Sequence, residues 1–103
     1  MPGESTPSSS GNNGERIYSK QHDDIDESTI DLSCSAGACE ITLQERIWQQ
    51  WSERQRWQLA ANGRINESVE VDSDFLDGDH KLEVVATANG TTVSGTFKSK
   101  DRQ

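Results

Sequence analysis

The last third of the sequence constrains the fold most, because it consists of short alternating runs separated by turn residues. Apolar side chains recur at every second position from Leu82 to Ala88, and the run from Val93 to Phe97 alternates in the same way. A period of two is the pattern of a β-strand with one buried face. The dipeptide Asn89-Gly90 between the runs is typical of a type I′ turn, whose central residues both need positive φ. This stretch therefore predicts an antiparallel hairpin.

Similar runs occur earlier in the chain. Arg16 to Ser19 is the first candidate strand and is expected at a sheet edge, and Trp57 to Ala61 leads into a second turn candidate at Asn62-Gly63. Together the chain supplies about six or seven short strands with turn signals every 8–12 residues, roughly the spacing expected of an antiparallel sandwich or barrel. The predicted fold class is mainly β.

One segment interrupts this pattern and favours a short helix from Leu43 to Arg54. The string from Thr42 to Glu45 matches a capping box, in which the threonine and glutamate side chains satisfy amides at a helix start. The apolar residues that fall on one helical face are Leu43, Ile47, Trp48 and Trp51. The alternative is a strand that continues to Ile47, and the alternation of Cys39, Ile41 and Leu43 supports its first half.

Residues 1–15 contain almost only Ser, Pro, Gly, Asn and Glu, so we expect a disordered tether followed by one domain over residues 16–103. A chain of 103 residues with 30% hydrophobic residues leaves room for a single small core. The polar run directly after Met1 is typical of a mature segment from which a signal peptide, with or without a lipid anchor, has been removed.

Cys34 and Cys39 are expected to form a disulfide. If the four residues between them (Ser35, Ala36, Gly37 and Ala38) form a loop, the cysteines face each other in antiparallel strands at a distance that a disulfide can bridge. Such a bond persists in an oxidising compartment, which predicts a periplasmic, cell-surface or secreted protein. Two reduced core thiols are the alternative. A zinc site is not expected, because no further Cys or His is nearby.

The C-terminal part resembles a known family. The string Leu76-Asp77-Gly78-Asp79-His80, followed by an alternating strand, the Asn89-Gly90 turn and a last strand, is similar to the closing strands of bacterial immunoglobulin-like domains. The segment from Trp57 to Gly63 resembles the tryptophan-bearing middle strand of that family, whereas Ala38 to Arg56 departs from it. The resemblance implies a small antiparallel immunoglobulin-like β-sandwich, here with one short helix. It also implies a non-catalytic extracytoplasmic spacer, adhesin or binding unit.

Charge narrows the choice of partner. The chain has 18 acidic and 10 basic residues, a formal charge of −8 and a pI of about 4.6. This field repels phosphate backbones and anionic lipid, so we expect no nucleic-acid partner. No apolar run approaches the roughly 20 residues that span a bilayer, so we expect no membrane insertion.

Three tryptophans and two arginines form the richest chemical cluster. Exposed rings with arginines beside them could contact a protein partner or stack on sugars, which makes Trp48, Trp51, Arg54 and Arg56 candidate binding residues. The alternative is that a chain with few apolar residues uses its tryptophans as core. We expect Trp51 and Trp57 in the core and Trp48 exposed.

Metal binding and catalysis find little support. The acidic turn of Asp72, Asp74, Asp77 and Asp79 lacks the spacing of the twelve-residue calcium loop, so calcium is not expected. His22 and His80 stand in no recognisable nucleophile context, and the disulfide accounts for both cysteines. We expect no catalytic residue, no metal and no cofactor.

The sequence therefore suggests a non-catalytic extracytoplasmic binding or structural module, the protein-binding part of a secreted, periplasmic or lipoprotein component of the cell envelope. One alternative is a small secreted enzyme inhibitor that uses the Cys34–Cys39 loop. Another is a carbohydrate-binding module that uses the Trp48–Trp57 segment.

Overall fold

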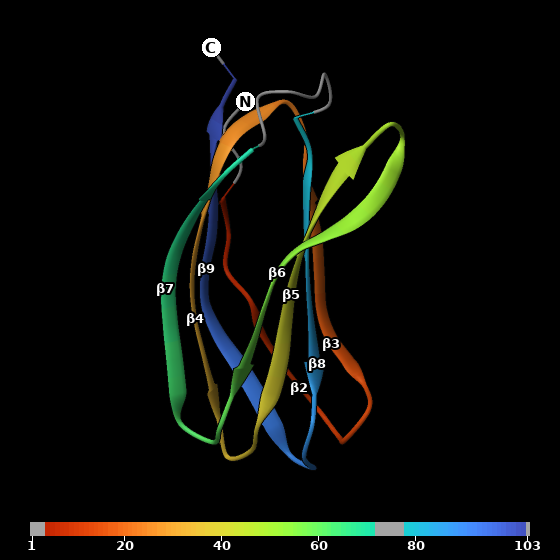
Figure 1. Cartoon of the computed structure of the whole chain (residues 1–103). Helices are drawn as coiled ribbons and strands as arrows, with labels where there is room; N and C mark the ends of the chain where they lie inside the picture. Colours follow the sequence, from red (N-terminus) through yellow and green to blue (C-terminus); the bar gives the residue numbers. More distant parts are fainter. Residues whose placement is uncertain (1–3, 72–77, 103) are drawn as a thin grey trace.

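Two antiparallel sheets pack face to face in the computed structural model, which describes residues 4–71 and 78–102 (Figure 1). The first sheet contains β1 (Glu4–Ser5) and β2 (Ser8–Gly11), which both pair with β9 (Thr91–Asp101), followed by β4 (Ile25–Ser35) and β7 (Gly63–Glu70). The second sheet has the order β3 (Arg16–His22), β8 (His80–Ala86), β5 (Cys39–Ile47) and β6 (Gln50–Leu59). This strand order is that of a jelly roll. The predicted mainly-β sandwich is confirmed.

Alternation along the central strands builds the core. In β4, β5 and β8 nearly every second side chain is buried, as a strand with one face against a second sheet requires. The fully buried apolar side chains are Ile25, Ile30, Leu32, Cys34, Ile41, Leu43, Leu82, Val84, Ala86, Val93 and Phe97.

The hairpin predicted at Asn89-Gly90 is wrong, and the turn candidate at Asn62-Gly63 forms no hairpin either. β6 and β7, and likewise β8 and β9, lie in different sheets, so the turns at Asn62-Gly63 and Asn89-Gly90 connect the sheets instead of pairing neighbours. Asn62 and Gly90 do adopt positive φ, 67° and 71°. Alternation shows which face of a strand is buried but not which strand it pairs with, and a turn with positive φ serves both connections.

The predicted helix over 43–54 is also wrong, and no helix occurs in the ranges that the structure describes. β5 continues to Ile47, and β6 begins at Gln50. This segment is therefore a tight hairpin, and among the described strands it is the one case in which two strands adjacent in the sequence pair with each other. β5 lies between β8 and β6, and pairing on both edges outweighs the local helical spacing.

The order of strands also differs from the immunoglobulin arrangement. In immunoglobulin domains the last two strands pair within one sheet. Here β8 and β9 belong to opposite sheets. The resemblance therefore holds at the level of a β-sandwich.

The N-terminal residues differ from the expected tether. β1 and β2 pair with β9, with Glu4 opposite Lys98 and Ser10 opposite Thr92. Pairing along the free edge of β9 uses backbone groups and needs no apolar side chains, so composition does not reveal it. β3 is an edge strand, as expected for the run from Arg16 to Ser19.

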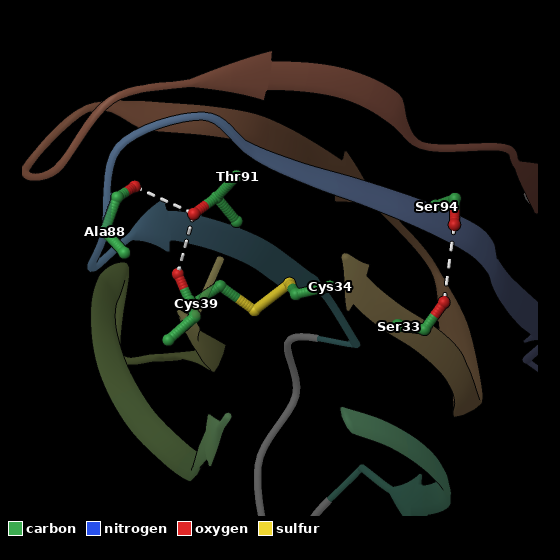
Figure 2. Close-up of a disulfide and its surroundings, with 7 residues drawn as sticks. Ser33, Cys34, Cys39, Ala88, Thr91 and Ser94 are labelled. Carbon is green, nitrogen blue, oxygen red and sulfur yellow. Dashed lines mark hydrogen bonds between the residues drawn. A yellow bond between two sulfur atoms is a disulfide. The ribbon is translucent and has the colours of Figure 1, made fainter. Parts of the chain in front are cut away.

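The Cys34–Cys39 disulfide is present, but it joins the two sheets (Figure 2). Cys34 ends β4 in the first sheet and Cys39 begins β5 in the second, with their Cα atoms 6.3 Å apart. The expectation that the cysteines oppose each other within one antiparallel pair is wrong, because both edges of β4 are taken by β7 and β9.

Removing the disulfide should weaken the fold only moderately. On the chain-entropy model, so short a loop contributes about 2 kcal/mol to the free energy of unfolding. We expect the Cys34→Ala, Cys39→Ala double variant to lose about that amount in urea denaturation while keeping the wild-type β-sheet spectrum. Complete unfolding of the double variant would contradict this expectation.

Gly95 in β9 should tolerate no side chain. Its φ is +133°, and an added Cβ would lie 2.0 Å from the Asp31 carbonyl oxygen of the neighbouring strand. We expect Gly95→Ala to lower the free energy of unfolding by about 3 kcal/mol or more. Gly14→Ala is the matched control, because Gly14 also has positive φ (+89°) but no atom within 4 Å of its Cβ position. The control should cost only about 1–2 kcal/mol, and equal losses in urea denaturation would contradict the steric argument.

Candidate functional site

The β5–β6 hairpin projects from one end of the sandwich. The last pair between β5 and β8 joins Glu45 to His80, whereas the pairing of β5 with β6 continues to Ile47 and Gln50. Figure 1 shows this yellow-green hairpin at the end of the sandwich opposite the connection from β4 to β5, which carries the disulfide. We call residues 46–51 the hairpin tip.

The turn at the hairpin tip is strained. Trp48 and Gln49 both have positive φ, 54° and 67°, as a type I′ turn requires. Glycine and asparagine adopt this conformation readily, whereas other L-residues lose about 1–2 kcal/mol each. Trp48 is also 77% exposed, the one large hydrophobic side chain that is exposed among the described residues. The expectation of an exposed Trp48 is confirmed.

Trp51 lies on the outer face of the second sheet. It pairs with Arg46, whose guanidinium carbon is 4.7 Å from the centre of the Trp51 ring, and the Lys81 ammonium is 4.8 Å from it. Arg46 is itself held by a salt bridge of 3.0 Å to Asp79. The prediction of a core position for Trp51 is wrong, because its neighbours are cations on the outer face.

The remaining members of the predicted cluster lie elsewhere. Trp57 packs against the core, as expected. Arg54 is the extra residue of a β-bulge and directs its Nε to Glu45, 3.7 Å from Oε1. The Arg56 guanidinium pairs with Glu40 and Glu53. The three tryptophans therefore do not lie together on one face of the sandwich.

The loop between the cysteines lies close against the sandwich. Ser35 and Ala36 are exposed, Gly37 is buried and Ala38 is half-buried. The Thr91 hydroxyl lies 3.1 Å from the Ala38 carbonyl oxygen and 2.8 Å from that of Ala88 (Figure 2). A Cβ at Gly37 would meet the Thr91 hydroxyl at 2.2 Å. Only the first half of the loop is therefore available for contact.

A second cluster, which no sequence pattern predicts, crosses the interior at the hairpin end. It takes one side chain from each of seven strands and is here called the polar chain: Ser5, His22, Ser99, Ser28, His80, Glu45 and Arg54. His80 is 0% exposed and Glu45 is 1% exposed. The residue types could be read from the sequence, but no spacing signal connects them.

Two imidazoles and two hydroxyls form the middle of the polar chain. His22 Nδ1 lies 2.5 Å from Ser99 Oγ, and the two serine oxygens of Ser99 and Ser28 are 3.4 Å apart. Ser28 Oγ is 2.6 Å from His80 Nδ1, and His80 Nε2 is 2.9 Å from Glu45 Oε1. At the other end, Ser5 Oγ is 3.0 Å from His22 Nε2.

A carboxylate at Glu45 sets the direction of these hydrogen bonds. A carboxylate only accepts, so His80 donates through Nε2–H and accepts at Nδ1 from the Ser28 hydroxyl. Ser28 in turn accepts from Ser99, and Ser99 accepts from His22 Nδ1–H. Each of the three contacts that link the two imidazoles then holds one proton.

Both imidazoles resist protonation. Burial lowers the pKa of His80 below its ordinary value, although the Glu45 carboxylate opposes this. Burial also lowers the pKa of His22, and Lys20 adds to the effect while Asp23 opposes it. His22 stacks on Phe97 with ring centres 4.2 Å apart. Both side chains are therefore neutral at pH 7.

The trio Ser28, His80 and Glu45 has the residue types of a catalytic triad but not its accessibility. Ser28 and His80 are both fully buried, so no substrate carbonyl can reach the Ser28 hydroxyl. In its folded form the trio is part of the core.

Of the four aspartates in the calcium candidate, the structure describes Asp79. Asp72, Asp74 and Asp77 lie outside the described residues. The Asp79 carboxylate pairs with Arg46 and accepts the Asp24 N–H at 3.1 Å. Within residues 4–71 and 78–102, no group of three or more His, Cys, Asp or Glu side chains is placed to hold a metal ion.

A shallow open hollow lies on the outer face of the β4–β9 pair. Its lining residues are Glu27, Thr29, Lys98, Ser99, Lys100 and Asp101. No aromatic ring is among them, so this hollow offers no stacking surface for a sugar.

Comparisons with known proteins bear on the fold. No protein-family model matches the sequence, and no curated protein matches it. The structure is similar to VP2 of infectious bursal disease virus, with a TM-score of 0.52 and 15% identity over 99% of this chain and 32% of that chain. The chain thus spans about a third of the VP2 proteins it matches.

Two further structures are similar. PirA has a TM-score of 0.52 and 14% identity over 95% of this chain and 92% of that chain. A carbohydrate-binding module specific for non-crystalline cellulose has a TM-score of 0.43 and 13% identity over 91% of this chain and 73% of that chain. At these identities the likeness shows a β-sandwich fold alone, and the last similarity carries no functional argument. The part of the chain that the structure describes contains no helix long and apolar enough to cross a membrane.

The hydrogen-bond directions in the polar chain predict one tautomer for each histidine. At pH 7.5, His22 should carry its proton on Nδ1 and His80 on Nε2. Nitrogen-15 chemical shifts of the two imidazoles measure this directly. A proton on Nδ1 of His80 would reverse the direction of the hydrogen bonds and would contradict this assignment.

Proposed function

We propose that this chain is a non-catalytic, extracytoplasmic protein-binding module whose binding element is the hairpin tip. The observation that carries the proposal is Trp48, which is 77% exposed at a turn where two consecutive residues adopt strained backbone. Asn-Gly would form this turn without strain and without exposing a ring. A Trp-Gln pair is therefore unfavourable for folding, which points to selection for contact.

The surroundings of Trp48 suit a protein contact. Tryptophan and arginine are the side chains most enriched among residues that dominate binding energy. Trp51 and Arg46 lie directly below the turn and are fixed by each other, by Lys81 and by Asp79. A fixed base reduces the conformational entropy that is lost on binding.

Charge and compartment support the class of partner. The formal charge of −8 disfavours nucleic acid and anionic lipid. The disulfide is consistent with an oxidising compartment, and we place the module outside the cytoplasm on that ground. The burial of Ser28 and His80 supports a non-catalytic role.

The two alternatives have less support. An inhibitor loop should project into a cleft, whereas Gly37 is buried under Thr91. A sugar platform needs coplanar open rings, whereas Trp57 packs on the core and Trp51 has cations against its ring.

The double variant Trp48→Asn, Gln49→Gly tests the proposal by separating strain from contact. We expect its free energy of unfolding to rise by about 1–3 kcal/mol, because the new turn residues adopt positive φ readily. We also expect it to lose a partner that the wild-type protein captures from the extracytoplasmic fraction of its source, measured by quantitative mass spectrometry.

Ser35→Ala, at the opposite end of the sandwich, is the matched control and should capture the same partner as the wild type. Equal capture by the hairpin variant and the wild type would overturn the hairpin assignment. Loss of capture in the control instead would favour the inhibitor loop. Capture of oligosaccharide on a glycan array, abolished by Trp48→Asn, would favour the carbohydrate alternative.

A further inference from the structure

We propose that the polar chain makes the hairpin tip acid-sensitive, so that mild acid loosens the binding element from the sandwich. The regulatory use of this property rests on the proposed function. The property itself belongs to the free protein.

The polar chain attaches both strands of the hairpin to the sandwich. Glu45 is the last residue of β5 that pairs with β8, immediately before the hairpin tip. Its buried carboxylate is bound by His80 from β8 and approached by Arg54 from β6. Through His80 and Ser28, the same carboxylate is linked to β4 in the opposite sheet. Any change at His80 therefore reaches the base of the hairpin.

The number of hydrogen-bond contacts between the two imidazoles limits how many protons the polar chain can take up. The three contacts His22–Ser99, Ser99–Ser28 and Ser28–His80 need three donors. With both imidazoles neutral, His22 Nδ1–H and the two hydroxyls supply three. If His80 alone gains a proton, all three bonds can reverse and His22 moves its own proton to Nε2, so the count remains three.

A second proton breaks this balance. With both imidazoles charged, two Nδ1–H groups and two hydroxyls give four donors for three contacts. One buried O–H is then left without an acceptor among its neighbours in the polar chain, which is unfavourable in the interior. This cost favours opening of the doubly protonated sandwich at this end, where water can hydrate that group.

The charged groups around the two histidines differ, and this difference sets the order in which the imidazoles take up protons. His80 faces Glu45, Arg54, Asp79 and the neutral Ser28, and the Glu45 carboxylate makes His80 the better site for a first proton. His22 faces Ser5, Ser99 and the Phe97 ring, with Lys20, Asp23 and His80 nearby. A second proton on His22 therefore lies beside a charged His80 and has no carboxylate hydrogen-bonded to it.

The sign of the pH dependence follows from the lowered histidine pKa values. Below the unfolded value of about 6.5, the unfolded chain binds more protons than the folded one, so stability falls as pH falls. Each unit of pKa depression lowers the folding equilibrium constant about tenfold per group once pH is below the folded pKa. The pKa of Asp31 is lowered by Arg64, so its contribution is lost only in more acidic solution, below its ordinary value of 3.8. Between pH 7.5 and 5.0 the two histidines therefore determine the pH dependence, and stability falls as pH falls.

The test is hydrogen exchange of the free, full-length protein at pH 7.5 and 5.0, analysed by mass spectrometry and corrected for intrinsic rates. We expect opening of residues 44–54 to increase at least about fivefold at pH 5.0, with little change in residues 35–41 beside the disulfide. His22→Gln keeps a donor and an acceptor but cannot take the second proton, so it should remove most of the increase. Gln21→Ala, on the same strand and exposed, should keep the wild-type response.

Nuclear magnetic resonance titration of the wild-type histidines decides the matter if His22→Gln fails to fold. Both imidazoles should titrate below pH 6.5, and His22 should titrate after His80. Titration of His22 at or above 6.5, or equal exchange of residues 44–54 at the two pH values, would overturn the proposal. These measurements need no partner. The acid-opening proposal can therefore be overturned while the hairpin variant still loses its partner, and acid opening can be observed while the hairpin variant keeps its partner.

Discussion

A single buried carboxylate, that of Glu45, dictates how the hairpin end of the sandwich is built. An ionised carboxylate inside a protein is strongly unfavourable unless donors surround it. Here His80 supplies one donor at 2.9 Å and Arg54 approaches from the neighbouring strand, brought there by a β-bulge. The need for a hydrogen-bond partner then extends to the next residue, because His80 requires a donor at its other nitrogen and receives one from Ser28. One charge thus determines the identity of side chains on strands of both sheets.

The sequence predicted what alternation alone can specify. The buried faces of β5 and β8 were readable because Ile41, Leu43, Leu82 and Val84 recur with period two. The same pattern ended at Leu43, because Glu45 at the next inward position carries a charge, and the capping-box match from Thr42 to Glu45 favoured a helix there. The buried partner that makes Glu45 an inward residue is 35 positions away in sequence. Periodicity cannot reveal such a pair.

The pairing of strands was the other part that sequence could not give. The turns at Asn62 and Gly90 do have the positive φ that their residue types suggest, yet both connect opposite sheets. The tight turn of the β5–β6 hairpin was formed instead by Trp48-Gln49, residues that no turn preference favours. For the candidate site, the exposure of Trp48 was predicted from the sequence, whereas the outward position of Trp51 depended on the register with Arg46.

The two ends of the sandwich are stabilised by different physics. At one end, the disulfide joins the sheets and the core beside it is apolar, so its stability depends little on pH. At the other end, hydrogen bonds among neutral imidazoles and hydroxyls replace apolar contacts. Strain at Trp48 and Gln49 is located at this second end. The covalent and apolar end holds the sheets together while the polar end opens, so the hairpin can respond to its surroundings without loss of the whole fold. An apolar residue in place of Glu45 would remove the buried charge and, with it, the chemical link between the hairpin and the opposite sheet.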